Sequence, residues 1–143
     1  MAEVLAGIIC GYGLSLIATP VAAIALVRAR ATSPLLAQVV PEGTSLVAVS
    51  VIIHTFAILT LTALGILLGL LLAGLESSSP AGGLGSPNRV FTAFVLIATA
   101  IAVGPFALAF ARLRRPILAA ALLFIACFGW LMPYLSLLGP GRT

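Results

Sequence analysis

The sequence predicts an all-α integral membrane protein whose four transmembrane helices form two consecutive hairpins. Of its 143 residues, 62% are hydrophobic and only 7% are charged, whereas roughly a quarter of the residues in a water-soluble domain are charged. The charged residues are seven arginines and three glutamates, and all lie at or beyond the ends of four long apolar runs. Because these runs lack the two-residue alternation of barrel strands, we expect each to form a helix.

The expected helices cover residues 4–27, 44–75, 90–111 and 117–138. A helix needs about 20 apolar residues to cross a hydrocarbon core about 30 Å thick, and each run is long enough. The whole chain, 1–143, is therefore expected to form a single four-helix transmembrane domain.

The first run is expected to remain in the protein as a helix rather than to be removed as a signal peptide. Glu3 lies where a signal peptide carries basic residues, and Arg28 is the first basic residue of the chain. The run is also longer than the apolar region of a signal peptide.

The connection between the first two helices is too apolar for a free loop and too short for another crossing. Ser33 followed by Pro34 is typical of a helix start, so we expect a short interfacial segment over about 33–41. Thr44 or Ser45 is then expected to cap the second helix.

Residues 4–75 and 90–138 show a weak internal similarity. In each, a proline (Pro20 or Pro105) stands about two turns before an Arg-x-Arg pair. The similarity indicates two hairpins related by an axis along the membrane normal, although prolines and terminal arginines are also common in unrelated membrane helices. The Gly/Ser/Pro-rich stretch 76–89 between them is expected to be a mobile external loop.

The arginines predict how the chain is oriented. The basic residues flanking the first and third connections are Arg28, Arg30, Arg112, Arg114 and Arg115. The opposite side carries only Arg89 and Arg142. The excess places both termini on the non-cytoplasmic side, and we expect a prokaryotic inner (cytoplasmic) membrane. The five arginines are expected to anchor the protein in the inner leaflet, which requires no nucleic-acid partner.

Two further pairs of residues have simple interpretations. Trp130 and Tyr134, one turn apart near the outer end of the fourth helix, are expected to be interfacial anchors rather than a stacking site for a ligand. Cys10 and Cys127 lie in different helices without metal-site spacing, so we expect small apolar residues.

His54 is the strongest candidate for chemistry, because it is the only histidine and lies about 15 Å deep, near the bilayer midplane. Ser50 precedes it by one turn. The imidazole could ligate a haem or chlorophyll metal, donate a hydrogen bond to a quinone, or relay protons. The alternative is a neutral histidine hydrogen-bonded to a hydroxyl or carbonyl on a neighbouring helix.

Small residues recur every four positions on the same helix, at Gly65, Gly69 and Ala73. Such a pattern lets another helix approach closely, and His54 lies within about 20° of Gly65 on the helix surface. This face is expected to be the packing seam, whether its partner is a helix of this chain or another subunit.

Prolines inside the helices are expected to produce kinks, which can be hinges, openings for a ligand or purely structural features. The prolines, each followed here by the carbonyl whose hydrogen bond it removes, are Pro20 with Leu16, Pro105 with Ile101 and Pro133 with Gly129.

The sequence contains no motif for catalysis or metal binding, so we expect a protein that is not an enzyme. Glu3, Glu42 and Glu76 all lie at helix ends, whereas coupled transporters usually hold a carboxylate at membrane depth. Nucleophile, base and metal-ligand clusters are also missing from the sequence.

Three functions remain open. The first is a non-catalytic accessory subunit of a larger membrane complex of the respiratory, photosynthetic or transport type. The second is a small homo-oligomeric channel or transporter whose pathway forms between subunits. The third is a haem-, chlorophyll- or quinone-binding subunit that uses His54. The expected partners are the lipid bilayer and either other membrane subunits or copies of the chain itself.

Overall fold

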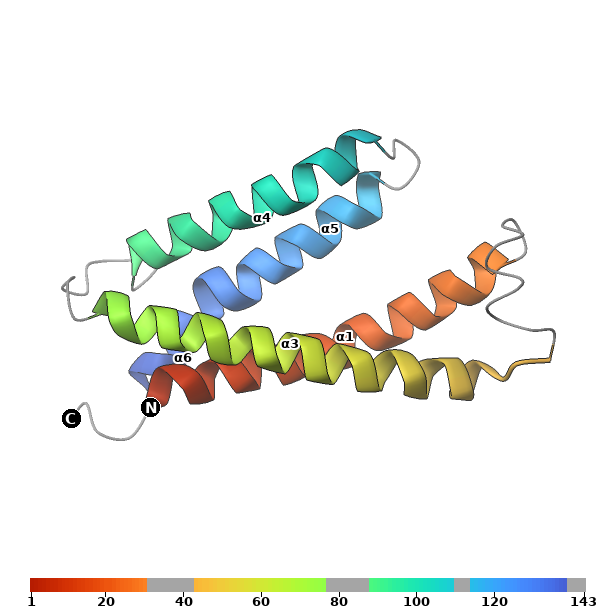
Figure 1. Ribbon diagram of the computed structural model, residues 1–143, viewed down its shortest axis with the longest axis horizontal. Coiled ribbons are helices and arrows are strands. Elements are labelled where there is room, and N and C mark those ends of the chain that lie inside the picture. Colours follow the sequence, from red (N-terminus) through yellow and green to blue (C-terminus); the bar gives the residue numbers. More distant parts are fainter. Residues whose placement is uncertain (31–42, 77–87, 110–113, 139–143) are drawn as a thin grey trace.

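The computed structural model describes residues 1–30, 43–76, 88–109 and 114–138, and these parts of the chain contain helices and no strand (Figure 1). The helices are α1 (Ala2–Arg30), α3 (Leu46–Glu76), α4 (Arg89–Ala109), α5 (Arg114–Phe124), the π-helical η2 (Ile125–Leu131) and α6 (Met132–Leu137). The last three run on from one another, so the described chain has four helical stretches long and apolar enough to cross a membrane. The predicted fold class is confirmed.

The helix ends differ from the predicted ones by a few residues, for local reasons. Ser45 caps α3, because the Ala48 amide donates to its hydroxyl oxygen at 3.1 Å. The fourth crossing begins at Arg114 rather than at residue 117, which places Pro116 in the first turn, where its missing amide proton is not needed. The predicted interfacial segment 33–41 lies outside the described residues.

The four helical stretches alternate in direction and meet at one end of the molecule (Figure 1). The largest core cluster lies there and joins every crossing; its buried members are Ala6, Cys10, Leu14, Leu72, Phe91, Val95, Phe128 and Met132. Because α1 contacts α6 and η2 as well as α3, it holds the second hairpin against the first.

At the other end the two hairpins diverge, and α4 and α5 lean away from α1 and α3 (Figure 1). Only the first hairpin has a buried cluster there, in which Ala23 and Val49 pack with Leu26 and Ile53. The fold therefore has one closed end and one end where the hairpins stand apart.

The π-helical segment is a feature that the sequence analysis did not predict. The Met132 amide donates to the carbonyl of Cys127, five residues earlier, instead of to the residue four earlier. The segment ends just before Pro133, which has no amide proton to donate to Gly129. A proline-related change of hydrogen-bond register explains why the fourth crossing is not one uniform α-helix.

Candidate functional site

His54 of α3 lies against Thr19 of α1, in the interior of the first hairpin. The Nδ1 atom of His54 is 2.9 Å from the Thr19 hydroxyl oxygen. The same hydroxyl donates to the Ser15 carbonyl at 2.7 Å, and both Ser15 and Thr19 are buried. The half-buried imidazole is therefore tied to the neighbouring helix by a short polar chain.

The direction of these hydrogen bonds determines the state of the ring. Thr19 has a single hydroxyl proton, and when this proton goes to Ser15 its oxygen accepts from the Nδ1–H of His54. The neutral ring then carries its lone pair on Nε2. Ser50, the half-buried residue one turn earlier, belongs to the same helix as His54, so the cross-helix partner is Thr19.

The small residues of α3 lie where this helix and α1 come closest. A Cβ atom on Gly65 would overlap the Gly7 carbonyl, and one on Gly69 would lie 2.7 Å from the carbonyl oxygen of Glu3. Ala73, the third position of the pattern, is exposed. The partner of Gly65 and Gly69 in this structure is thus α1 of the same chain.

The matching residues on α1 were missed in the sequence analysis, although the sequence contains the signal for them. Gly7 and Gly11 are four residues apart, which is the same small-residue spacing as on α3. A Cβ atom on Gly11 would lie 2.7 Å from the Leu61 carbonyl carbon. The two glycine pairs let the backbones of α1 and α3 touch.

A second polar contact joins the helices of the other hairpin. The Thr92 hydroxyl of α4 donates to the Gly129 carbonyl of η2 at 2.5 Å. Since Pro133 cannot supply an amide proton to that carbonyl, Thr92 supplies one from the neighbouring helix. Asn88 prepares this site by capping α4, with its side-chain oxygen 3.0 Å from the Phe91 amide.

The predicted anchoring residues lie at both ends of the bundle. Arg28 at the end of α1 and Arg114 and Arg115 at the start of α5 are exposed and share the end where the hairpins diverge (Figure 1). Arg112 and the side chain of Arg30 lie outside the described part of the chain.

Toward the closed end, the aromatic rings of Trp130 and Tyr134 stack at 5.0 Å between centroids, tilted by 59°. Trp130 is exposed and Tyr134 is half-buried. Both cysteines lie inside the bundle: Cys10 is buried in the main core cluster, and Cys127 packs against that cluster from η2.

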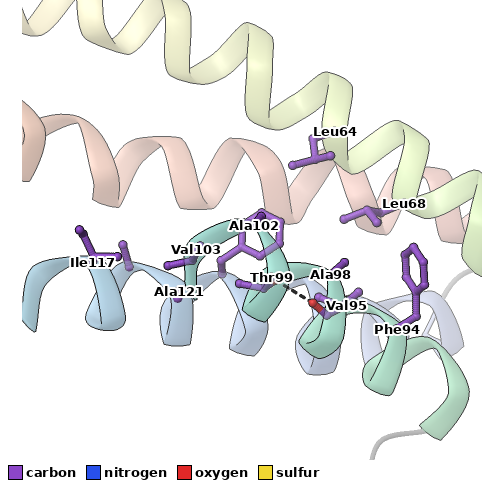
Figure 2. A pocket seen from close by; sticks show the side chains of 12 residues that line it. Leu64, Leu68, Phe94, Val95, Ala98, Thr99, Ala102, Val103, Ile117 and Ala121 are labelled. Carbon is purple, nitrogen blue, oxygen red and sulfur yellow. Dashed lines mark hydrogen bonds between the residues drawn. The ribbon is translucent and has the colours of Figure 1, made fainter. Parts of the chain in front are cut away.

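An apolar cleft of about 610 Å³ separates α3 from the second hairpin (Figure 2). Leu64 and Leu68 of α3 reach toward α4, and α5 contributes Ile117 and Phe124. A smaller groove of about 290 Å³ lies along α4 and α5 and includes Leu118. Neither had been predicted, because a cleft between hairpins depends on how helices far apart in sequence diverge.

No protein-family model, curated protein or solved structure matches this chain. Within the described residues, no three histidine, cysteine, aspartate or glutamate side chains gather in a way that could hold a metal ion. The functional argument therefore depends on the geometry of the polar contacts and the cleft.

Proposed function

We propose that this protein is a small, non-catalytic accessory subunit of a larger membrane assembly. The observation that carries the proposal is how its intramembrane polar groups are used. Thr19 with His54 ties α1 to α3, and Thr92 with Gly129 ties α4 to η2. The two contacts lie in different hairpins and hold helices together, which is the role of polar side chains in a packing subunit.

The outer face of α3 is the surface on which we expect a partner helix. It lies opposite Gly65 and Gly69, and its large side chains are all more than half exposed: Ile52, Phe56, Leu59, Leu67 and Leu70. With 31 residues, α3 is about 46 Å long at about 1.5 Å per residue, longer than the hydrocarbon core of about 30 Å. Its outer face is therefore available along a full crossing.

The test is cross-linking in native membranes from a photoreactive residue at Phe56. A partner on this face gives an adduct with a distinct membrane protein, while the same group at Ile101, an exposed position on α4, serves as the control. An adduct with a second copy would favour the homo-oligomeric channel or transporter instead. If the protein purifies alone and monodisperse, with no partner from native membranes, the accessory role fails.

We further propose that the end bearing Arg28, Arg114 and Arg115 faces the cytoplasm of a prokaryotic cell, with both termini on the opposite side. The three arginines are exposed at one end of the bundle, as the positive-inside rule requires of cytoplasmic connections. Single cysteines placed at Arg115 and at Arg89, in a chain with Cys10 and Cys127 replaced, should react with an impermeant maleimide from opposite sides of the membrane. Labelling of both from the same side would refute the orientation.

A second candidate function, cofactor binding at His54, is favoured by the contact with Thr19. Histidine ligands usually donate one ring N–H to a neighbour, which directs the other nitrogen toward the ligand. Thr19 occupies Nδ1, so Nε2 would be the atom that binds a haem or chlorophyll metal or a quinone. His54→Ala should then lose the bound group while the helical content is retained. An unchanged absorption spectrum and quinone content would exclude this function.

A further inference from the structure

The cleft between α3 and the second hairpin has an almost entirely apolar lining. Its one polar side chain is Thr99, whose hydroxyl donates to the Val95 carbonyl of its own helix at 2.7 Å (Figure 2). A polar ligand would lose its hydrogen bonds to water without replacing them here, at a cost of several kcal/mol per group. Hydrocarbon is the chemistry that the cleft accepts.

Small side chains make this room. Ala98 and Ala102 of α4 and Ala120 and Ala121 of α5 line the cleft, so the second hairpin presents a low surface to the leucines of α3. The volume of about 610 Å³ lies within the range of about 300–1,000 Å³ typical of ligand pockets.

The length of the cleft fits one leaflet rather than a whole bilayer. On α4 the lining runs from Phe94 to Val103, which corresponds to about 13 Å at about 1.5 Å per residue. Half of a hydrocarbon core of about 30 Å is about 15 Å, the depth that one lipid chain occupies. A partner transmembrane helix would need a groove about twice as long.

A positive charge stands at one end of the cleft, on the same face of α5 as its lining. Arg114 precedes Ile117 by three residues, Ala121 by seven and Phe124 by ten, so all four share one helical stripe. Arg114 is exposed, and helical side chains tilt toward the helix N-terminus, which here leads out of the apolar region. A guanidinium group at that place matches the geometry of a phosphate.

We propose that this cleft binds one hydrocarbon chain of an anionic phospholipid whose phosphate contacts Arg114. The lipid fills the space left where the hairpins diverge and lies in the leaflet on the arginine side. Because the site lies between α3 and the second hairpin, it is independent of the accessory role and of the outer face of α3.

The test is native mass spectrometry of the full chain in detergent, with dioleoyl phosphatidylglycerol and dioleoyl phosphatidylcholine offered separately. We expect one retained lipid and about a fivefold preference for phosphatidylglycerol, the effect of one basic residue on an anionic lipid. Arg114→Gln should abolish this preference and leave the retention of phosphatidylcholine unchanged. Arg89→Gln, which removes the same charge at the start of α4, should keep the preference.

Two substitutions that fill the cleft test where the chain binds. Ala102→Phe on α4 and Ala120→Phe on α5 should each lower the retention of both lipids by roughly tenfold, because the ring takes the space of the chain. Ala119→Phe is the matched control, since Ala119 is exposed on α5 and lines neither the cleft nor the smaller groove. Circular dichroism identifies any variant that has lost its helices, and the two positions on different helices provide independent measurements.

A photoreactive residue at Leu64, on the α3 wall, identifies the occupant directly. An adduct with the mass of phosphatidylglycerol supports the proposal. An adduct with a protein, a second copy included, overturns it, as does equal retention of both lipids by the unchanged protein or full retention in both filled variants.

Discussion

His54 and Thr19 show, at the scale of single residues, how a polar group is accommodated in a membrane helix pair. The imidazole lies within reach of a hydroxyl on the facing helix, and that hydroxyl returns its own proton to the Ser15 carbonyl. Polar side chains in the bilayer need such partners, since lipid offers none. The remaining hydroxyls with known bonds on α3, at Thr55 and Thr60, donate only to carbonyls of their own helix.

The first prediction concerns the contact between His54 and Thr19. Thr19→Val keeps the side-chain shape but removes the hydroxyl, so the free energy of unfolding should fall by about 1 kcal/mol. Unfolding in mixed micelles with increasing SDS measures the change. Thr55→Val is the control, because the Thr55 hydroxyl is exposed and bonds only to Val51; equal losses in the two variants would contradict the cross-helix bond.

At the scale of elements, α1 and α3 form a hairpin in which the backbones touch. Gly7 meets Gly65, and Gly69 meets the first turn of α1, so dispersion contacts act at the shortest distance that helices allow. The fourth crossing follows a different rule. Its helix changes register near Pro133, and Thr92 of α4 supplies the hydrogen bond that the proline cannot.

The second prediction tests the glycine contact. Gly65→Ala places a methyl group into the Gly7 carbonyl, so the helices must separate, and we expect a loss of about 1–3 kcal/mol in stability. Gly74→Ala makes the same change on the same helix in open space and should be neutral or slightly stabilising, because alanine favours helix. If Gly74→Ala destabilises as strongly as Gly65→Ala, the close approach is not the cause.

The third prediction couples Thr92 to Pro133. Thr92→Val should lower the free energy of unfolding by about 1 kcal/mol, but by less when Pro133→Ala supplies an amide proton for Gly129. A double-mutant cycle measures this coupling, for which we expect about 0.5 kcal/mol or more. Thr99→Val, whose hydroxyl bonds only to Val95 of the same helix, should show no coupling to Pro133→Ala. Additive effects of Thr92→Val and Pro133→Ala would refute the compensation.

At the scale of the whole molecule, the two hairpins are joined at one end and apart at the other. The joint consists of α1 packing against η2 and α6, with Cys10 and Cys127 in or against the same cluster. A joint at one end leaves the cleft beside α3 as a consequence, because the small residues of α4 and α5 do not fill the space between the diverging helices.

The fourth prediction tests this joint. A short, membrane-permeant reagent that links two thiols should join Cys10 to Cys127 within one molecule, and mass spectrometry of the digested protein should find the two peptides connected. Cys127→Ala should remove the product. Two separate single adducts, or links between different molecules, would mean that η2 does not dock on α1 as described.

Much of the fold could be predicted from the sequence because of the solvent. A bilayer requires about 20 apolar residues per crossing and excludes charge from its core, so the four runs and their charged ends defined the helices to within a few residues. Gly65 and Gly69 were likewise visible as a close-packing pattern. The partner of His54 could not be predicted, since Thr19 is 35 residues away and many hydroxyls compete for that role.

The sequence by itself determined that this protein is a set of four membrane-length helices with a small-residue seam and one intramembrane histidine. Only the tertiary structure decided that the seam faces α1, that Thr92 serves the carbonyl freed by Pro133, and that the hairpins part to leave a cleft below Arg114. The physical reason is range. Hydropathy and helix period act within one segment, whereas helix pairing and divergence depend on side chains that meet from distant parts of the chain.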